Sequence, residues 1–170
     1  EESVFYYHNK LMSYGARYTG TLNCTLAGHY IYNEFKEMGL DTTFHEWEYD
    51  GFKSRNIVGI LQGSYPSSNV IFIMSAHYDC TPGSPGADDD GSGVAAVLAT
   101  AKVMSQYRFN HTIYFIAFAG EEVGTYGSFT YARDAYNSGK NIVAVINVDM
   151  VGYADSAKGG NILRFHSPER

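Results

Sequence analysis

The sequence is poor in cysteine, has no basic cluster and contains no long apolar run. Its only cysteines are Cys24 and Cys80, which could pair or both be free. Twelve basic residues stand against 18 acidic ones, giving a net charge of −6, so a nucleic-acid partner is not expected. No stretch approaches the roughly 18 uninterrupted apolar residues of a spanning helix, so no segment is expected to cross a membrane.

The chain also lacks an initiator methionine and an apolar signal segment. It begins at Glu1, and we expect a mature form or an expressed piece of something longer. At 170 residues it is expected to be one domain with a real core. The triplets 23–25 and 110–112 fit the N-glycosylation sequon, a weak pattern. With few lysines and 15 tyrosines, they favour an extracellular or cell-envelope location.

Apolar periodicity predicts both helices and strands. Residues 17–23 are expected to form a loop. Helical spacing of apolar residues predicts helices over 4–14, 25–38, 94–107 and about 128–136. Short β-branched and aromatic runs predict strands over 42–49, 56–61, 70–74, 112–118, 142–148 and 161–165.

The predicted strands differ in how they should be covered. Residues 42–49 alternate in polarity, as in a half-exposed edge strand. The runs 70–74, 112–118 and 142–148 are nearly continuous in apolarity, which is typical of strands buried on both faces. Helices separate these three strands, so we expect a three-layer α/β/α sandwich with a mixed, mainly parallel sheet over residues 1–170.

Three adjacent carboxylates, Asp88, Asp89 and Asp90, follow the strand that delivers His77 and Asp79. Adjacent carboxylates repel one another, and a divalent cation relieves that repulsion. A solvated acidic turn is the alternative interpretation of such a run.

Side chains that can ligate a metal follow all three predicted buried strands. His77 and Asp79 follow the first, Glu121 and Glu122 the second, and Asp149 the third. In open α/β sheets, sites collect at the carboxyl ends of the strands. Imidazole and carboxylate donors suit zinc, manganese or cobalt at a hydrolytic centre, which favours the metal-site interpretation.

The sequence resembles the M28-type zinc aminopeptidases, the co-catalytic dizinc exopeptidases. N-terminal segments that fit are 17–20, 38–40 and 56–58. The motifs that carry the resemblance are His77-Tyr-Asp79, Pro85-Gly-Ala-Asp-Asp-Asp-Gly-Ser-Gly93, Ala119-Gly-Glu-Glu122, Tyr126-Gly-Ser128 and Asn147-Val-Asp-Met150.

The resemblance implies a role for each motif residue and a peptide substrate with a free N-terminus. In the intact family site two zinc ions would bind. The implied roles are His77 and Asp149 as ligands of one ion, Asp89 as the bridge, preceding a cis peptide bond to Asp90, Glu122 as a ligand of the second ion, Glu121 as general base, and Asp79 as the residue that orients His77. Asp88 and Asp90 are then supporting residues.

One element of the family pattern is missing. The family places a further histidine on the second metal, well downstream of the aspartate that matches Asp149. His166 lies too early to match and is expected to be a surface or strand-end residue. We therefore expect a C-terminally truncated catalytic domain that holds one zinc ion or none and is poorly active.

Other functions on the same scaffold stay open at this point: a carboxypeptidase, a one-zinc glutaminyl cyclase, or a non-catalytic receptor-like module. A serine hydrolase is poorly supported because Ser92 lies outside a Gly-x-Ser-x-Gly motif. The aspartate run fits neither a phosphate-binding loop, which needs a lysine, nor an EF-hand, which alternates its carboxylates.

Overall fold

The described part of the chain folds around one mixed five-stranded sheet. The computed structural model describes residues 2–154, 164, 166 and 167. Its strands are β1 (Asp41–Tyr49), β2 (Phe52–Leu61), β3 (Val70–His77), β4 (Thr112–Phe118) and β5 (Asn141–Asn147). Its helices are α1 (Glu2–Met12), α2 (Leu22–Glu37), α3 (Gly91–Met104) and α4 (Tyr126–Asn137).

The strand order is β1-β2-β4-β3-β5. β3 pairs in parallel with β4 on one side and with β5 on the other, whereas β2 is antiparallel to both β1 and β4. Four strands therefore run in one direction and β2 runs against them. The predicted mixed sheet with a parallel core is confirmed, and β1 lies at an edge as its alternating pattern predicts.

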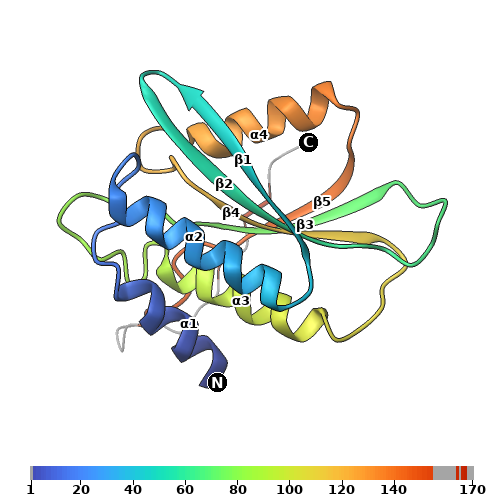
Figure 1. Ribbon diagram of the computed structural model, residues 1–170, viewed down its shortest axis with the longest axis horizontal. Coiled ribbons are helices and arrows are strands. Elements are labelled where there is room, and N and C mark those ends of the chain that lie inside the picture. Colours follow the sequence, from blue (N-terminus) through green and yellow to red (C-terminus); the bar gives the residue numbers. More distant parts are fainter. Residues whose placement is uncertain (1, 155–163, 165, 168–170) are drawn as a thin grey trace.

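Helices cover both faces of the sheet (Figure 1). α1, α2 and α3 lie on one face, and α4 lies on the other. Side chains of β4 alternate between the two layers, because successive residues of a strand point to opposite faces. Phe115 and Ala117 belong to the larger core under α2 and α3, and Tyr114 and Ile116 to the smaller core under α4.

All four helices begin two or three residues earlier than their apolar periodicity predicts, and a capping side chain explains this for α2 and α3. Thr21 caps α2 by accepting a hydrogen bond from the backbone N–H of Cys24, so the helix starts at Leu22 and shortens the expected loop. Asp90 caps α3 by accepting from the N–H of Gly93, so that helix starts at Gly91. Capping side chains satisfy the free N–H groups of a first turn, and that turn need not contain apolar residues.

The expectation that the 142–148 strand is buried on both faces is wrong. In β5 the side chains of Val143, Val145 and Ile146 are 52%, 56% and 64% exposed. β5 ends the sheet, and within the described residues no further strand pairs with its outer edge. The apolar sequence favours an extended strand, but burial of that strand requires other elements packed against both of its faces. The strand predicted over 161–165 falls almost wholly outside the described residues.

Among the described residues, no helix is both long and apolar enough to cross a membrane.

Candidate metal centre

The three parallel strands end at one edge of the sheet. β3 ends at His77, and β4 and β5 pair with it in parallel on either side. The turn after β4 carries Glu121 and Glu122, and the segment after β5 carries Asp149. Parallel pairing therefore gathers the predicted site residues at the carboxyl edge of the sheet.

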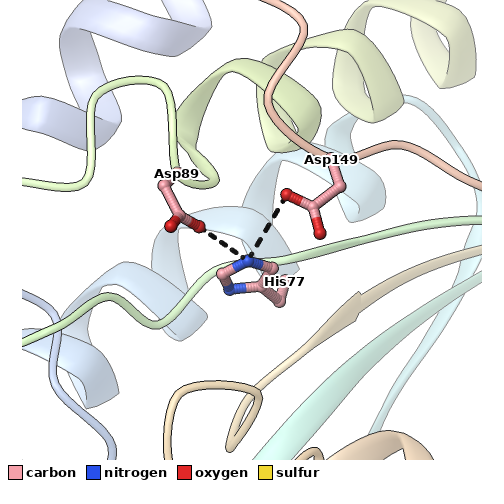
Figure 2. A group of neighbouring side chains, drawn as sticks. All are labelled: His77, Asp89 and Asp149. Carbon is pink, nitrogen blue, oxygen red and sulfur yellow. Dashed lines mark ion pairs between the residues drawn. The ribbon is translucent and has the colours of Figure 1, made fainter. Parts of the chain in front are cut away.

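His77 faces two carboxylates from different segments (Figure 2). Its Nε2 atom lies 3.1 Å from Oδ1 of Asp89 and 4.0 Å from Oδ1 of Asp149. The ligand atoms of these three residues all lie within 4.8 Å of one another. The imidazole is buried, whereas the two carboxylate side chains are 50% and 48% exposed. The three-residue group is thus buried on the side of His77 and open to solvent on the side of Asp89 and Asp149.

One imidazole and two carboxylates are a donor set that fits Zn²⁺. Catalytic zinc sites use three protein ligands of these kinds and keep a further position for water or substrate. The exposure of Asp89 and Asp149 leaves such a position accessible. His77, Asp89 and Asp149 are therefore the residues that would hold the ion.

The charge environment of His77 favours its protonated form when no metal is bound. Burial by itself lowers the pKa of the imidazole, but the carboxylates of Asp79 and Asp90 outweigh burial and raise the pKa to about 9. The ring nitrogen Nδ1 lies 3.1 Å from the backbone oxygen of Asp79 and 3.6 Å from its Oδ1 atom. A metal ion bound at Nε2 would replace the proton that this nitrogen carries in the protonated imidazole.

The two outer aspartates of the acidic run make structural hydrogen bonds. Asp90 is fully buried and accepts from the N–H groups of His77, Gly93 and Met150. Asp88 accepts from the hydroxyl of Ser92 at 2.9 Å and from the N–H of Gly152 at 2.7 Å.

The carboxylate of Asp90 is therefore occupied by backbone donors and is outside the group formed by His77, Asp89 and Asp149. The peptide bond between Asp89 and Asp90 is cis. Burial raises the pKa of Asp90 to about 7, although the imidazole of His77 opposes the shift.

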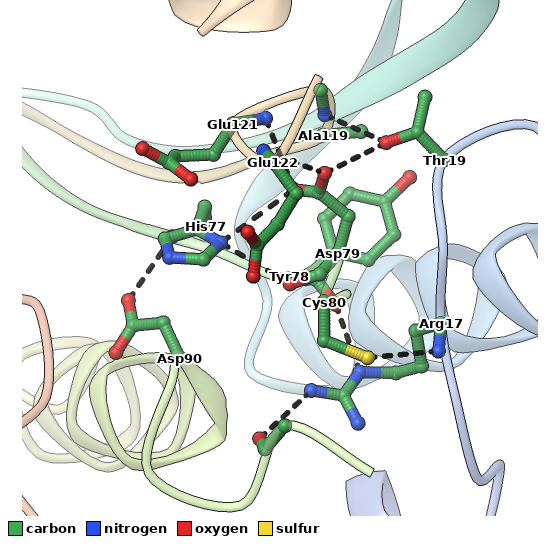
Figure 3. A network of polar contacts seen from close by, with 12 residues as sticks. Arg17, Thr19, His77, Tyr78, Asp79, Cys80, Asp90, Ala119, Glu121 and Glu122 are labelled. Atoms are coloured by element: carbon green, nitrogen blue, oxygen red, sulfur yellow. Dashed lines mark hydrogen bonds and ion pairs between the residues drawn. The ribbon is translucent and has the colours of Figure 1, made fainter. Parts of the chain in front are cut away.

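Asp79 connects His77 to the glutamate turn (Figure 3). Its carboxylate is fully buried and accepts hydrogen bonds from the N–H groups of Glu121 at 3.2 Å and Glu122 at 3.3 Å. A third donor, the hydroxyl of Thr19, lies 2.7 Å from Oδ2. One carboxylate thus fixes the imidazole and the turn relative to each other.

Glu121 and Glu122 flank the centre without joining the three-residue group, as far as the described residues show. Both side chains are partly buried. Burial, and then neighbouring carboxylates that include Asp149, raise the pKa of Glu121 against the opposing effect of His77. For Glu122 the main causes are burial and the nearby Asp89. A raised carboxyl pKa suits a group that accepts and returns a proton near neutral pH.

A cavity of about 360 Å³ opens beside the centre. His77, Glu121 and Asp149 line one end of it. Its remaining wall is mainly apolar and comes from β3, β5 and α4, with Ile73, Val145 and Tyr131 among its residues. The centre therefore adjoins a space that can take an organic group.

Three buried polar residues support the centre, and sequence reasoning gave none of them a role. Asn56 holds both ends of the segment that contains the two glutamates, because it accepts from the N–H of Ala119 at 3.1 Å and donates to the carbonyl of Gly127 at 2.9 Å. The available signal was an amide at the start of an otherwise apolar strand. Thr19 is the second of these residues.

Arg17 is the third and is fully buried. Its guanidinium donates to the backbone oxygens of Tyr78 at 2.8 Å, of Gly86 at 3.1 Å, and of Pro85. It thereby holds the loop that leads to the aspartate run. The only sequence signal was that Arg17 and Thr19 lie in the N-terminal segment 17–20, which fits the resemblance.

The remaining residues singled out in the sequence do not belong to the three-residue metal group of the described chain. Cys24 and Cys80 are both buried and free, so they do not pair. Burial raises the pKa of Cys24 to about 12. His166, expected at the surface, is exposed.

Comparisons with known proteins agree with this geometry. Residues 56–163 match Peptidase family M28. A probable zinc metalloprotease of Pyrenophora tritici-repentis is 30% identical over 88% of this chain and 36% of its own length. Aminopeptidase YwaD of Bacillus subtilis is 39% identical over 58% of this chain and 22% of its own length.

Solved structures share the fold of the chain. LapB from Legionella pneumophila superposes with a TM-score of 0.83 at 27% identity, over 92% of this chain and 45% of that one. A glutaminyl cyclase from Bacteroides thetaiotaomicron superposes with a TM-score of 0.78 at 25% identity, over 89% of this chain and 62% of that one. The chain thus spans 22% to 62% of the length of these relatives.

Proposed function

Since this chain belongs to peptidase family M28, we propose that it forms the metal-binding catalytic part of a zinc-dependent aminopeptidase. The observation that carries the proposal is the convergence of His77, Asp89 and Asp149 within 4.8 Å, beside Glu121. The similarity to an aminopeptidase of Bacillus subtilis supports the N-terminal specificity.

The proposed reaction is hydrolysis of the N-terminal peptide bond. Zinc, when bound, supplies a Lewis acid that polarises the scissile carbonyl and lowers the pKa of a water molecule. Glu121 accepts a proton as the water oxygen forms its bond to the carbonyl carbon, and it returns that proton to the leaving amine as the C–N bond breaks. Asp79 keeps Nδ1 of His77 engaged, so that Nε2 faces Asp89 and Asp149.

The donors present support one complete zinc site. His77 is the single histidine of the group among the described residues. A second ion would have Asp89 and Glu122 as its proposed protein ligands. We therefore propose that the chain as given holds about one zinc ion and turns over slowly. Two tightly held ions per chain, measured by elemental analysis after dialysis, would overturn this stoichiometry.

Two substitutions separate the proposed roles. Glu121→Ala should abolish hydrolysis of an aminoacyl-nitroanilide while zinc content stays near that of the wild type. Asp89→Ala should lose zinc as well as activity, because it removes a ligand. Equal loss of zinc from both variants would contradict the assignment of Glu121 as the base.

Glutaminyl cyclisation is the second candidate, favoured by the similarity to the glutaminyl cyclase of Bacteroides thetaiotaomicron. That reaction releases ammonia from an N-terminal glutamine and consumes no water. Mass spectrometry of a glutamine-initiated peptide separates the two functions, since hydrolysis shortens the peptide by one residue and cyclisation removes only ammonia.

A further inference from the structure

We propose that Thr19, in the loop before α2, is a positioning residue that holds the Glu121–Glu122 turn in register with His77 through Asp79. The proposal rests on the proposed function, and it adds a contribution from a segment that precedes the region of the family match, residues 56–163. Thr19 touches neither a substrate nor the proposed ligands directly.

The hydroxyl of Thr19 is buried and uses both of its hydrogen-bonding capacities. The residue is 3% exposed. Its Oγ1 atom donates to Oδ2 of Asp79 at 2.7 Å and accepts from the backbone N–H of Gly120 at 3.1 Å. A single hydroxyl oxygen can donate and accept at once, so no apolar residue reproduces this pair of contacts.

Asp79 transmits the position of Thr19 to the centre. The N–H groups of the two residues after Gly120, Glu121 and Glu122, donate to its carboxylate. The same carboxylate lies 3.6 Å from Nδ1 of His77 (Figure 3). Three successive N–H groups of the turn are thus held by two side chains, Thr19 and Asp79.

Loss of the hydroxyl should loosen the turn specifically. Asp79 would lose the shortest of its hydrogen bonds, and the N–H of Gly120 would lose its partner. A buried carboxylate needs its donors, so Asp79 would be free to turn toward other partners and would hold Glu121 and Glu122 less firmly. Loss of a group that supports a metal ligand through hydrogen bonds typically weakens metal binding about 10- to 100-fold.

The test compares Thr19→Val, which removes the hydroxyl and keeps the shape, with Thr19→Ser, which keeps the hydroxyl. Thr130→Val is the matched control. Thr130 is 1% exposed, and its hydroxyl donates to the backbone oxygens of Tyr126 at 2.8 Å and Gly127 at 3.0 Å within α4. The control therefore removes an equally buried hydroxyl whose hydrogen bonds go neither to Asp79 nor to residues 120–122.

Three measurements are made on the full 170-residue chain: amide hydrogen exchange at Gly120, Glu121 and Glu122, zinc affinity by competition with a chromophoric chelator, and urea unfolding. For Thr19→Val we expect exchange at these three amides and the zinc dissociation constant each to rise by about tenfold or more. Thr19→Ser should restore both to wild-type values. Thr130→Val should lower stability while leaving both unchanged.

Wild-type exchange and affinity in Thr19→Val would overturn the proposal, and so would equal effects in Thr19→Val and Thr130→Val. If Thr19→Val does not fold, the test is amide exchange in the wild type and in Thr19→Ser. All three amides must then exchange slowly and equally in both proteins, and exchange at the rate of an unstructured peptide overturns the proposal. Failure of the wild type to bind zinc would contradict the proposed function, while the exchange data would still test Thr19.

Discussion

Asp90 accepts a hydrogen bond from the backbone N–H of Met150 at 3.2 Å. Asp90 follows Asp89 in the chain and Met150 follows Asp149, so the neighbours of two proposed ligands are bonded directly to each other. The same carboxylate also accepts from the N–H of His77. The relative positions of all three proposed ligands therefore depend on one buried side chain.

Replacing Asp90 by alanine should destabilise the fold and weaken the metal site together. Three backbone donors would lose their partner, and α3 would lose its N-cap. We expect a loss of roughly 3 kcal/mol in the free energy of unfolding, measured in urea. Asp41→Ala, an exposed aspartate of β1, is the control and should change stability by less than about 0.5 kcal/mol. Equal stability of the two variants would contradict the role given to Asp90.

Asn56→Leu should be strongly destabilising although leucine is similar in size. The substitution leaves the N–H of Ala119 buried without its partner, at about 1–3 kcal/mol. The carbonyl of Gly127 also loses the amide donor of Asn56 and keeps the hydroxyl of Thr130. The exposed pair Asn141 and Asn69 provides the control, since Asn141→Leu breaks an amide–amide hydrogen bond at the surface. A thermal or urea midpoint for Asn56→Leu as high as that of Asn141→Leu would show that the buried bonds are not needed.

The pH dependence of the metal-free chain should be dominated by His77 and Asp90. The pKa of His77 is about 9 against an ordinary 6.5, and that of Asp90 is about 7 against an ordinary 3.8. Both values are raised, so the fold favours the protonated forms. Their contributions to stability are present below the ordinary values and are lost as pH rises through about 7 for Asp90 and about 9 for His77.

Zinc should oppose the loss of stability with rising pH, because an imidazole bound to zinc carries no proton on Nε2. The zinc affinity should rise by up to about tenfold per pH unit until the pH reaches the pKa of His77. Chelator competition and urea unfolding, each with and without zinc, measure both effects between pH 6.5 and about 9. A zinc affinity that does not change over this range would show that His77 is already neutral in the metal-free chain.

The edge strand β5 should make this chain associate with itself at high concentration. Val143, Val145 and Ile146 are more than half exposed on a strand whose outer edge is unpaired in the described part of the chain. Exposed apolar edges pair with other strands, and an edge lysine suppresses such pairing. Val145→Lys should therefore reduce the apparent mass in sedimentation velocity at high concentration. Exposed Phe72 lies in the internal strand β3, so Phe72→Lys should leave association unchanged.

Local patterns predicted the elements of this fold well. The bounds expected for the 112–118 strand are those of β4, and the helix–strand alternation yields the parallel order around β3. Helix starts were less accurate, because Thr21 and Asp90 act through hydrogen bonds that leave no apolar periodicity. The exposure of β5 could not be predicted, since burial depends on what packs against a strand and not on the strand itself.

The site was predictable where chemistry and strand ends coincide. His77, Asp89 and Asp149 carry donor groups, and a parallel sheet brings the ends of neighbouring strands together. Thr19 and Asn56 carry no distinctive chemistry. Their importance comes from contacts across large separations in sequence, 101 positions in the case of Thr19 and Gly120. Only the folded arrangement identifies them.

The buried guanidinium of Arg17 limits how this protein can be divided. Arg17 donates to backbone oxygens on both sides of the loop after β3, from a segment that precedes residues 56–163. A fragment trimmed to that core would remove the guanidinium that donates to those carbonyl oxygens, and Asp79 would lose the hydrogen bond from Thr19 as well. The segment that carries Arg17 and Thr19 is therefore an integral part of the framework of the site, and the smallest autonomous folding unit has to include it.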